Sequence, residues 1–356
     1  MISTIDDINR LIEDTSKRNA SDLHMAVGLP PTCRINGRLF PLPYKILEPA
    51  DTEAFASQLL NDQQMDYLQK TGEIDISMSS YGKYRCRLNI FRQKSFFSLA
   101  FRMLNPLIHD FEALGLPTVL NDLCSLNRGL ILITGPTGTG KTTTLAAMID
   151  WINTNKDCHI VTLEDPIEYV HQHKKSIVNQ REIGQDSNSY ASALRAVLRQ
   201  DPDVILIGEM RDLESIAIAL TAAETGHLVL STLHTIGASK TIDRIIDVFP
   251  PFQQHQIRTQ LSMVLQAVIS QQLLPLSDGT GRVVATEVML TIPAIRNMIR
   301  ENKIHQITNA IQTSGKQSMK SMDISLLDLY KRGKITIEDA LTYATDPEYM
   351  KKILSC

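Results

Sequence analysis

The chain has 356 residues, of which 43% are hydrophobic and 21% charged, as expected of a soluble globular protein long enough for two domains. Its formal charge of −3, from 36 basic and 39 acidic residues, provides no overall field for nucleic acid, so such a partner would need a local basic patch. The five scattered cysteines argue against a zinc site and a disulfide framework and fit a reducing cytosol. No signal peptide or apolar run long enough to span a bilayer is evident, so any membrane role would come through partners.

The first hundred residues mix helical and strand-like patterns. Apolar residues recur at helical spacing in residues 5–16 and again in 51–69. Short alternating runs broken by turn residues fill the stretch between them, and the runs EIDISM, YRCRLNIF and SFFSLAFRML follow up to residue 103. We therefore expect an α+β domain over residues 1–103.

Residues 104–117 carry the proline and glycine breakers of a linker, and the pattern changes after them. From 118 to 356 the apolar runs GLILIT, CHIVTL, DVILIG, HLVLST and VVATEVML alternate with helical segments. Buried strands separated by helices predict a largely parallel sheet covered on both faces, a RecA-like α/β core. The end of the chain, from about residue 293 to 356, is expected to be helical, with segments near 293–301, 304–313, 318–332 and 336–344.

The clearest chemical signal is a P-loop that follows the first of these apolar runs. The sequence G-x-x-x-x-G-K-T lies between a predicted strand and a predicted helix, the context that a P-loop requires. Its backbone N–H groups and the helix N-terminus favour phosphate, Lys141 is expected to reach the β- and γ-phosphates, and the Thr142 hydroxyl is expected to bind Mg²⁺. The predicted ATP-binding residues are Gly135, Pro136, Thr137, Gly138, Thr139, Gly140, Lys141, Thr142 and Thr143.

Two acidic residues follow other predicted strands. Glu209 ends the run VILIG in the Walker B pattern, and a carboxylate there holds the Mg²⁺ shell, through water in our interpretation. Glu164 ends CHIVTL and is followed by Pro166, which breaks the chain there. Ligands bind at the carboxyl ends of parallel strands, so Glu164 is a candidate to orient or deprotonate the attacking water. The alternative for Glu164 is a solvated acidic turn.

His234 ends the run HLVLST and is a candidate γ-phosphate sensor, although a histidine in that position can also be structural. An arginine supplied by a neighbouring subunit can raise the rate of phosphoryl transfer by about 10³–10⁵. Our candidates for that role are Arg85, Arg87, Arg195 and Arg199, and solvation or ion pairing is the alternative for each.

Taken together, the motifs resemble those of the secretion ATPase superfamily. GPTGTGKTTT, TLEDPIEY, NQREIGQD, ALRAVLRQDPDVILIGEMRD and ALTAAETGHLVLSTLHT resemble its Walker A, Asp-box, Walker B and His-box blocks. SDLHM, PPTCRINGRL and AIRNMI resemble elements of its type IV pilus retraction branch, with Met298 in place of leucine. The resemblance covers nearly the whole chain.

This resemblance implies a homohexameric ATPase ring in which each subunit has a PAS-like N-terminal domain and a RecA-like domain, with ATP between them. It implies that Glu164 is the catalytic carboxylate, Glu209 the Walker B acid and His234 the His-box residue, with Lys141 at the phosphates. The ring would act with an inner-membrane platform protein and the pilus machinery at the cytoplasmic base of the pilus, peripheral to the membrane, to retract pili and drive twitching motility. No direct contact with nucleic acid is implied.

Other functions remain open at this point. The chain could be an assembly or secretion ATPase of the same superfamily, or an accessory nucleotide-binding protein that hydrolyses poorly and acts through a partner retraction motor. A nucleic-acid translocase is disfavoured by the acidic balance of charge.

In the predicted helix at 293–301, Ile295, Met298 and Ile299 share one face and are expected to pack inward. Arg296, Asn297 and Arg300 are expected on the polar side. The resemblance suggests that this side is a surface coupling ATP hydrolysis to the pilus, and the alternative is a solvated helix face.

Overall fold

A computed structural model describes residues 4–35, 37–81, 84–104, 107–313 and 318–354. By their internal contacts these residues form two units. The first contains the chain up to Leu107 together with Pro166–Val170, and the second contains Ile108–Asp165 and the chain from His171 onward. The start of the expected linker at Asn105–Pro106 lies outside the described residues, and Phe111 and Leu116 of its second half are buried in the second unit. None of the described helices has the length and apolarity needed to cross a bilayer.

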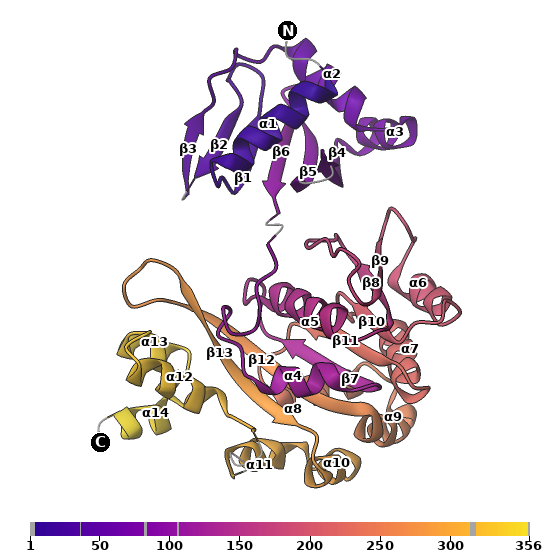
Figure 1. Cartoon of the computed structure of the whole chain (residues 1–356), viewed down its shortest axis with the longest axis vertical. Coiled ribbons are helices and arrows are strands. Elements are labelled where there is room, and N and C mark those ends of the chain that lie inside the picture. Colours follow the sequence, from indigo (N-terminus) through magenta and orange to yellow (C-terminus); the bar gives the residue numbers. More distant parts are fainter. Residues whose placement is uncertain (1–3, 36, 82–83, 105–106, 314–317, 355–356) are drawn as a thin grey trace. The chain divides into compact units, whose positions relative to one another are not determined.

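The first unit is an antiparallel sheet with three helices (Figure 1). The sheet has the order β3-β2-β1-β6-β5-β4. The strands are β1 Asp22–Met25, β2 Thr32–Ile35, β3 Arg38–Pro41, β4 Glu73–Ser80, β5 Tyr84–Gln93 and β6 Phe96–Met103, and the helices are α1 Ile5–Lys17, α2 Pro49–Leu59 and α3 Asp62–Thr71. The α+β prediction is confirmed, whereas the likeness to a PAS domain stays a prediction.

Local sequence explains where these helices begin and end. Thr4 and Asp7 form a capping box at the start of α1: the side chain of each residue accepts a hydrogen bond from the backbone N–H of the other. The single helix expected over residues 51–69 is in fact two helices. Leu60 is extended, and the Asn61 side chain accepts a hydrogen bond from the Gln64 N–H to start α3. Asparagine is favoured as an N-cap because its side-chain oxygen satisfies such a donor.

The second unit contains a sheet of order β13-β12-β7-β11-β10-β8-β9. All neighbouring strands are parallel except β12 and β13, so the predicted, largely parallel sheet is confirmed. The strands are β7 Gly129–Thr134, β8 His159–Glu164, β9 Ile177–Glu182, β10 Val204–Ile207, β11 Leu228–Leu233, β12 Leu265–Pro275 and β13 Arg282–Leu290. The sequence patterns had not marked β9 or β12 as strands.

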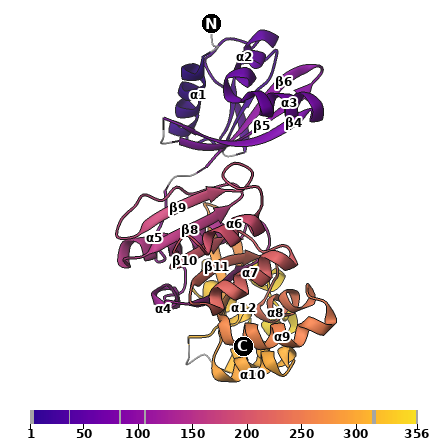
Figure 2. The same cartoon turned by 90° about the vertical axis from the view of Figure 1, so that its right-hand side faces the viewer.

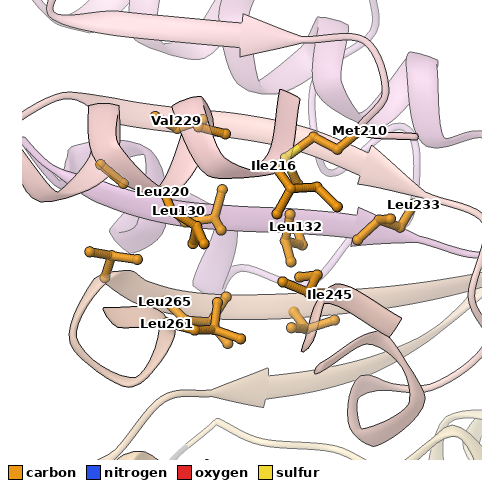
Figure 3. Close-up of a cluster of buried hydrophobic side chains, with 14 of the residues drawn as sticks. Leu130, Leu132, Met210, Ile216, Leu220, Val229, Leu233, Ile245, Leu261 and Leu265 are labelled. Atoms are coloured by element: carbon orange, nitrogen blue, oxygen red, sulfur yellow. The ribbon is translucent and has the colours of Figure 1, made fainter. Parts of the chain in front are cut away.

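Helices cover both faces of this sheet, because the apolar side chains of its strands alternate between two cores. Leu130 and Leu132 of β7 lie among side chains of α7, α8 and α9 (Figure 3). Ile131 and Ile133 point to the other face, against α4 and α5. The helices are α4 Val119–Ser125, α5 Lys141–Asn155, α6 Tyr190–Val197, α7 Leu213–Glu224, α8 Ala238–Asp247 and α9 Pro251–Val264.

Beyond β13 the described residues are mainly helical, as predicted, and Pro347–Leu354 forms a helix outside the four expected segments. The elements are α10 Pro293–Arg300, the short 3₁₀ helix η1 Ile304–Gln306, α11 Ile307–Thr313, α12 Met322–Lys331, α13 Ile337–Thr342 and α14 Pro347–Leu354. The helix expected from residue 318 starts at Met322, because the Ser321 hydroxyl caps it by accepting from the Ile324 N–H. Pro347 begins α14, because proline is tolerated in the first turn of a helix.

Candidate active site

The P-loop joins β7 to α5, so the predicted order of strand, loop and helix is confirmed. Gly135, Gly138 and Gly140 have φ angles of 139°, 83° and 85°, values that favour glycine. A Cβ on Gly135 would lie 2.3 Å from the carbonyl oxygen of Gln271. By contrast, a Cβ on Gly138 or Gly140 would meet no atom within 4 Å, so the loop backbone is open on that side.

Lys141 is the first residue of α5 and is only 8% exposed. Its ammonium group donates to the carbonyl oxygens of Gly135 at 2.8 Å and Pro136 at 2.9 Å. Burial lowers the pKa of Lys141, and the negative charge of Glu209 acts in the opposite direction. A lysine beside backbone N–H groups at a helix N-terminus suits a polyphosphate, so the residues present fit the predicted nucleotide.

A buried glutamine, Gln271, contacts both ends of the P-loop region. Gln271 of β12 is fully buried, and its side-chain amide exchanges hydrogen bonds of 2.8 and 3.3 Å with the Thr144 hydroxyl on α5. Together with the close approach of its carbonyl to Gly135, this contact fixes the start of α5 against β12. Sequence reasoning missed Gln271, because β12 was not predicted.

The carboxyl ends of β8, β10 and β11 are held in line by hydrogen bonds. The Gly208 N–H donates to the carbonyl oxygen of Leu163 at 2.8 Å, and the Thr232 hydroxyl donates to the carbonyl oxygen of Gly208 at 2.6 Å. This alignment brings the residues that follow β10 and β11 together. Glu209 Oε2 lies 3.1 Å from His234 Nε2, and its Oε1 lies 2.5 Å from the guanidinium of Arg211. Glu164, the last residue of β8, is 9% exposed.

Tyr190 is a second residue that sequence reasoning missed. A Cβ on Gly208 would lie 2.9 Å from the Tyr190 hydroxyl and 3.3 Å from the carbonyl oxygen of Leu163, so a side chain at this position would displace the Tyr190 hydroxyl. Burial, and then the negative charges of Asp165, Glu209 and Glu164, raise the pKa of Tyr190. Its hydroxyl therefore stays protonated beside these carboxylates.

The loop after His234 is anchored to β12 and β13. The Gly237 N–H donates to the Ser270 hydroxyl at 3.0 Å, and the Ala238 N–H donates to Glu287 Oε1 at 2.8 Å. Burial raises the pKa of Glu287, while backbone N–H donors, that of Ala238 first among them, act to lower it. The His234 loop is thus connected to the strand that also supports the P-loop.

The four candidate trans-acting arginines all make contacts within the chain. Arg85 donates to the Ile167 carbonyl at 2.7 Å within the first unit, and Arg87 lies 3.6 Å from Asp75. Arg195 forms an ion pair with Glu214, and Arg199 donates to the Arg195 carbonyl at 3.0 Å. Their role in trans stays a prediction.

Arg296 lies outside the buried face of α10, as predicted, but it is only half-exposed. Ile295 and Ile299 are fully buried and Met298 packs against the same core, as predicted. The Arg296 guanidinium, however, donates to the carbonyl oxygens of Ser262 and Met263 at the end of α9, both at 2.8 Å. These carbonyls have no partner within their helix, so an arginine there satisfies them. The polar side of α10 is therefore reduced to its exposed residues, Asn297 and Arg300.

Comparison with known families connects this geometry to a class of proteins. Residues 2–341 match the family model described as type II/IV secretion system protein. The chain belongs to that family.

Two relatives and one solved structure match this chain over most of their own length. The type IV pilus retraction ATPase PilT of Pseudomonas aeruginosa is 47% identical over 342 residues, covering 96% of this chain and 99% of its own. A twitching motility protein of Neisseria gonorrhoeae is 46% identical over 320 residues, covering 90% of this chain and 86% of its own. The crystal structure of the pilus retraction motor PilT with bound ADP matches with a TM-score of 0.91 and 48% identity, over 97% of this chain and 99% of that one.

Proposed function

We propose that this chain is an ATPase motor subunit whose ATP hydrolysis powers type IV pilus retraction. The observation that carries the proposal is the likeness to the retraction ATPase of Pseudomonas aeruginosa across 96% of this chain and 99% of that protein. It is supported by the P-loop and by acidic residues at the carboxyl ends of neighbouring strands, the arrangement that phosphoryl transfer uses.

We assign the roles in hydrolysis as follows. The backbone N–H groups of the P-loop, at residues 135 and 137–143, and the Lys141 ammonium bind the β- and γ-phosphates. The Thr142 hydroxyl, and Glu209 through water, would hold Mg²⁺, which when bound neutralises charge on the phosphates. Glu164 orients the attacking water and takes its proton as the oxygen bonds to the γ-phosphorus, and the bond to the β–γ bridging oxygen breaks to leave ADP. His234, paired with Glu209, responds to the γ-phosphate.

The test of function is made in cells that produce retractable type IV pili. Deleting the gene for this chain should leave pili that extend but never shorten, and restoring the wild-type gene should restore shortening. Normal shortening after the deletion would contradict the proposal.

An accessory protein that hydrolyses poorly is the second candidate, because an intact motif set does not measure turnover. The ATPase rate of the purified chain, with and without Mg²⁺, separates the two. Mg²⁺-dependent turnover by the chain alone supports a motor. Turnover that requires a second retraction ATPase supports the accessory role.

We also propose that the chain works as a homohexamer, peripheral to the cytoplasmic face of the inner membrane through the pilus platform protein. An arginine from a neighbouring subunit, among Arg85, Arg87, Arg195 and Arg199, would complete each site. Activity should then rise steeply with protein concentration, and adding Lys141→Ala subunits should reduce it by more than dilution. A strictly proportional loss would show that the subunits act independently.

The coupling surface on α10 needs a revised test, because Arg296 is engaged with α9. We propose that the exposed Asn297 and Arg300 pass movement to the pilus machinery. Asn297→Ala with Arg300→Ala should leave ATP hydrolysis unchanged and abolish pilus shortening. Shortening that survives, or an ATPase rate that falls in parallel, would contradict this role.

A further inference from the structure

Glu164 is held by two side chains that come from different strands. Its Oε1 accepts a hydrogen bond from the Thr162 hydroxyl at 2.6 Å and another from the Gln180 side-chain amide nitrogen at 3.1 Å. Thr162 lies two residues before Glu164 on β8 and is 1% exposed. Gln180 lies on β9, which runs beside β8 at the edge of the sheet (Figure 2). The two strands are parallel, and Gln180 pairs with Thr162.

A third contact fixes which way the Gln180 amide points. Its oxygen accepts a hydrogen bond from the backbone N–H of His171 at 2.8 Å. Since a backbone N–H can only donate, the amide oxygen has to face His171, and the amide NH₂ has to face Glu164. The side-chain amide of Gln180 is therefore fixed in one orientation, in which its NH₂ group donates to the Glu164 carboxylate.

Two donors on one oxygen restrict the rotation of a carboxyl group. Hydrogen bonds to a charged acceptor are short and strong, and here they form in a largely buried setting. A general base has to stand within hydrogen-bond reach of the proton that it removes, and a misplacement of about 1 Å can cost about 10²-fold in rate. Residues that hold the Glu164 carboxylate in the right orientation therefore raise the rate of hydrolysis, even if they do not touch the substrate.

We infer that Thr162 and Gln180 are positioning residues that set the orientation of the Glu164 carboxylate for hydrolysis. This inference rests on the proposed catalytic role of Glu164. It predicts that both residues affect the catalytic step and leave nucleotide binding unchanged, because neither belongs to the P-loop.

The strongest variant is Gln180→Glu. It keeps an oxygen to accept from the His171 N–H, so the contact with the backbone is preserved. It replaces the N–H donor to Glu164 with a second carboxyl group, whose charge repels that of Glu164. Thr162→Val removes the hydroxyl with little change in shape, and Thr162→Ser keeps it. In the purified full chain we expect kcat to fall by about 10- to 100-fold for Gln180→Glu and Thr162→Val, with KM for ATP within about twofold of wild type. Thr162→Ser should restore most of the rate.

Combining each change with Glu164→Gln decides whether the effect passes through Glu164. Once the carboxylate is gone, Gln180→Glu and Thr162→Val should lower the residual rate by less than about twofold. Wild-type kcat in both single variants would overturn the inference, as would a parallel rise in KM or a full additional loss in the Glu164→Gln background. If Gln180→Glu does not fold, the comparison of Thr162→Val with Thr162→Ser gives the same answer.

A different result would contradict the proposed catalytic role of Glu164 itself. Wild-type turnover in Glu164→Gln alone would show that Glu164 is not the catalytic carboxylate, whatever Thr162 and Gln180 do. An inactive Glu164→Gln beside fully active Gln180→Glu and Thr162→Val would overturn only the positioning role.

Discussion

The phosphate side of the site comes from one continuous segment between β7 and α5, whereas the carboxylate side takes Glu164, Glu209 and His234 from the ends of β8, β10 and β11. On the phosphate side the backbone provides most of the binding groups, and glycine conformations shape it. On the carboxylate side each acid has, besides a near neighbour in the chain, a partner distant in sequence, Gln180 for Glu164 and His234 for Glu209. The phosphate side therefore tolerates few substitutions within the P-loop. The geometry of the carboxylate side depends on how several strands are aligned.

The largest effect on the phosphate side should come from Lys141→Ala. Truncating one partner of a buried, charged contact costs about 2–5 kcal/mol, so ATP should bind at least about 30-fold more weakly. Lys175→Ala is a matched control, because Lys175 is exposed and lies in the same unit. Equilibrium binding of a fluorescent ATP analogue measures both. Unchanged affinity in Lys141→Ala would remove that residue from the phosphate site.

Next in size is the effect of a methyl group on the loop glycines. Gly135→Ala places a Cβ 2.3 Å from a backbone oxygen at a φ of 139°, so we expect the free energy of unfolding to fall by about 3 kcal/mol. Gly138→Ala meets open space and carries only the strain of its φ, about 1–2 kcal/mol. Denaturant unfolding of the two variants measures the difference. Equal losses would show that contact with β12 does not shape the loop.

The carboxylate side should show a smaller effect that depends on pH. Burial lowers the pKa of His171 to about 4, from an ordinary value of 6.5. The unfolded chain therefore binds a proton at this residue before the folded chain does. Its contribution to stability is complete above pH 6.5 and is lost as pH falls from 6.5 toward 4.

Between pH 7 and pH 5 this amounts to about 2 kcal/mol of unfolding free energy. His171→Gln lacks the titrating ring, so its stability should fall by about that much less over the same interval. Denaturant unfolding of both proteins at the two pH values tests this. The same pH dependence in both would mean that His171 is protonated as readily in the folded chain as in the unfolded one.

The contrast between the two sides also explains how far the sequence could predict the site. The P-loop was predictable because its glycines, lysine and flanking periodicities are contiguous. Glu164, Glu209 and His234 were recognisable because each ends an apolar run. Gln180 and Gln271 were not, since they act through the pairing of β9 with β8 and of β12 with β7, and a single sequence does not show which strands pair.

Arg296 illustrates the same limit on a helix. Helical spacing correctly placed Ile295 and Ile299 inward. It assigned Arg296 to the polar side, but could not show that the end of α9 would lie there with unpaired carbonyl groups. The long side chain of an arginine can reach such groups from the margin of a buried face.

The central claim is that Glu164 acts in the chemical step at a site whose phosphate side binds ATP independently of it. Single-turnover hydrolysis by purified Glu164→Gln, with bound ATP and ADP separated after quenching, tests this most directly. We predict that the variant binds as much ATP as wild type and converts it at least about 10²-fold more slowly, the scale of losing a positioned base. Conversion at the wild-type rate would contradict the account.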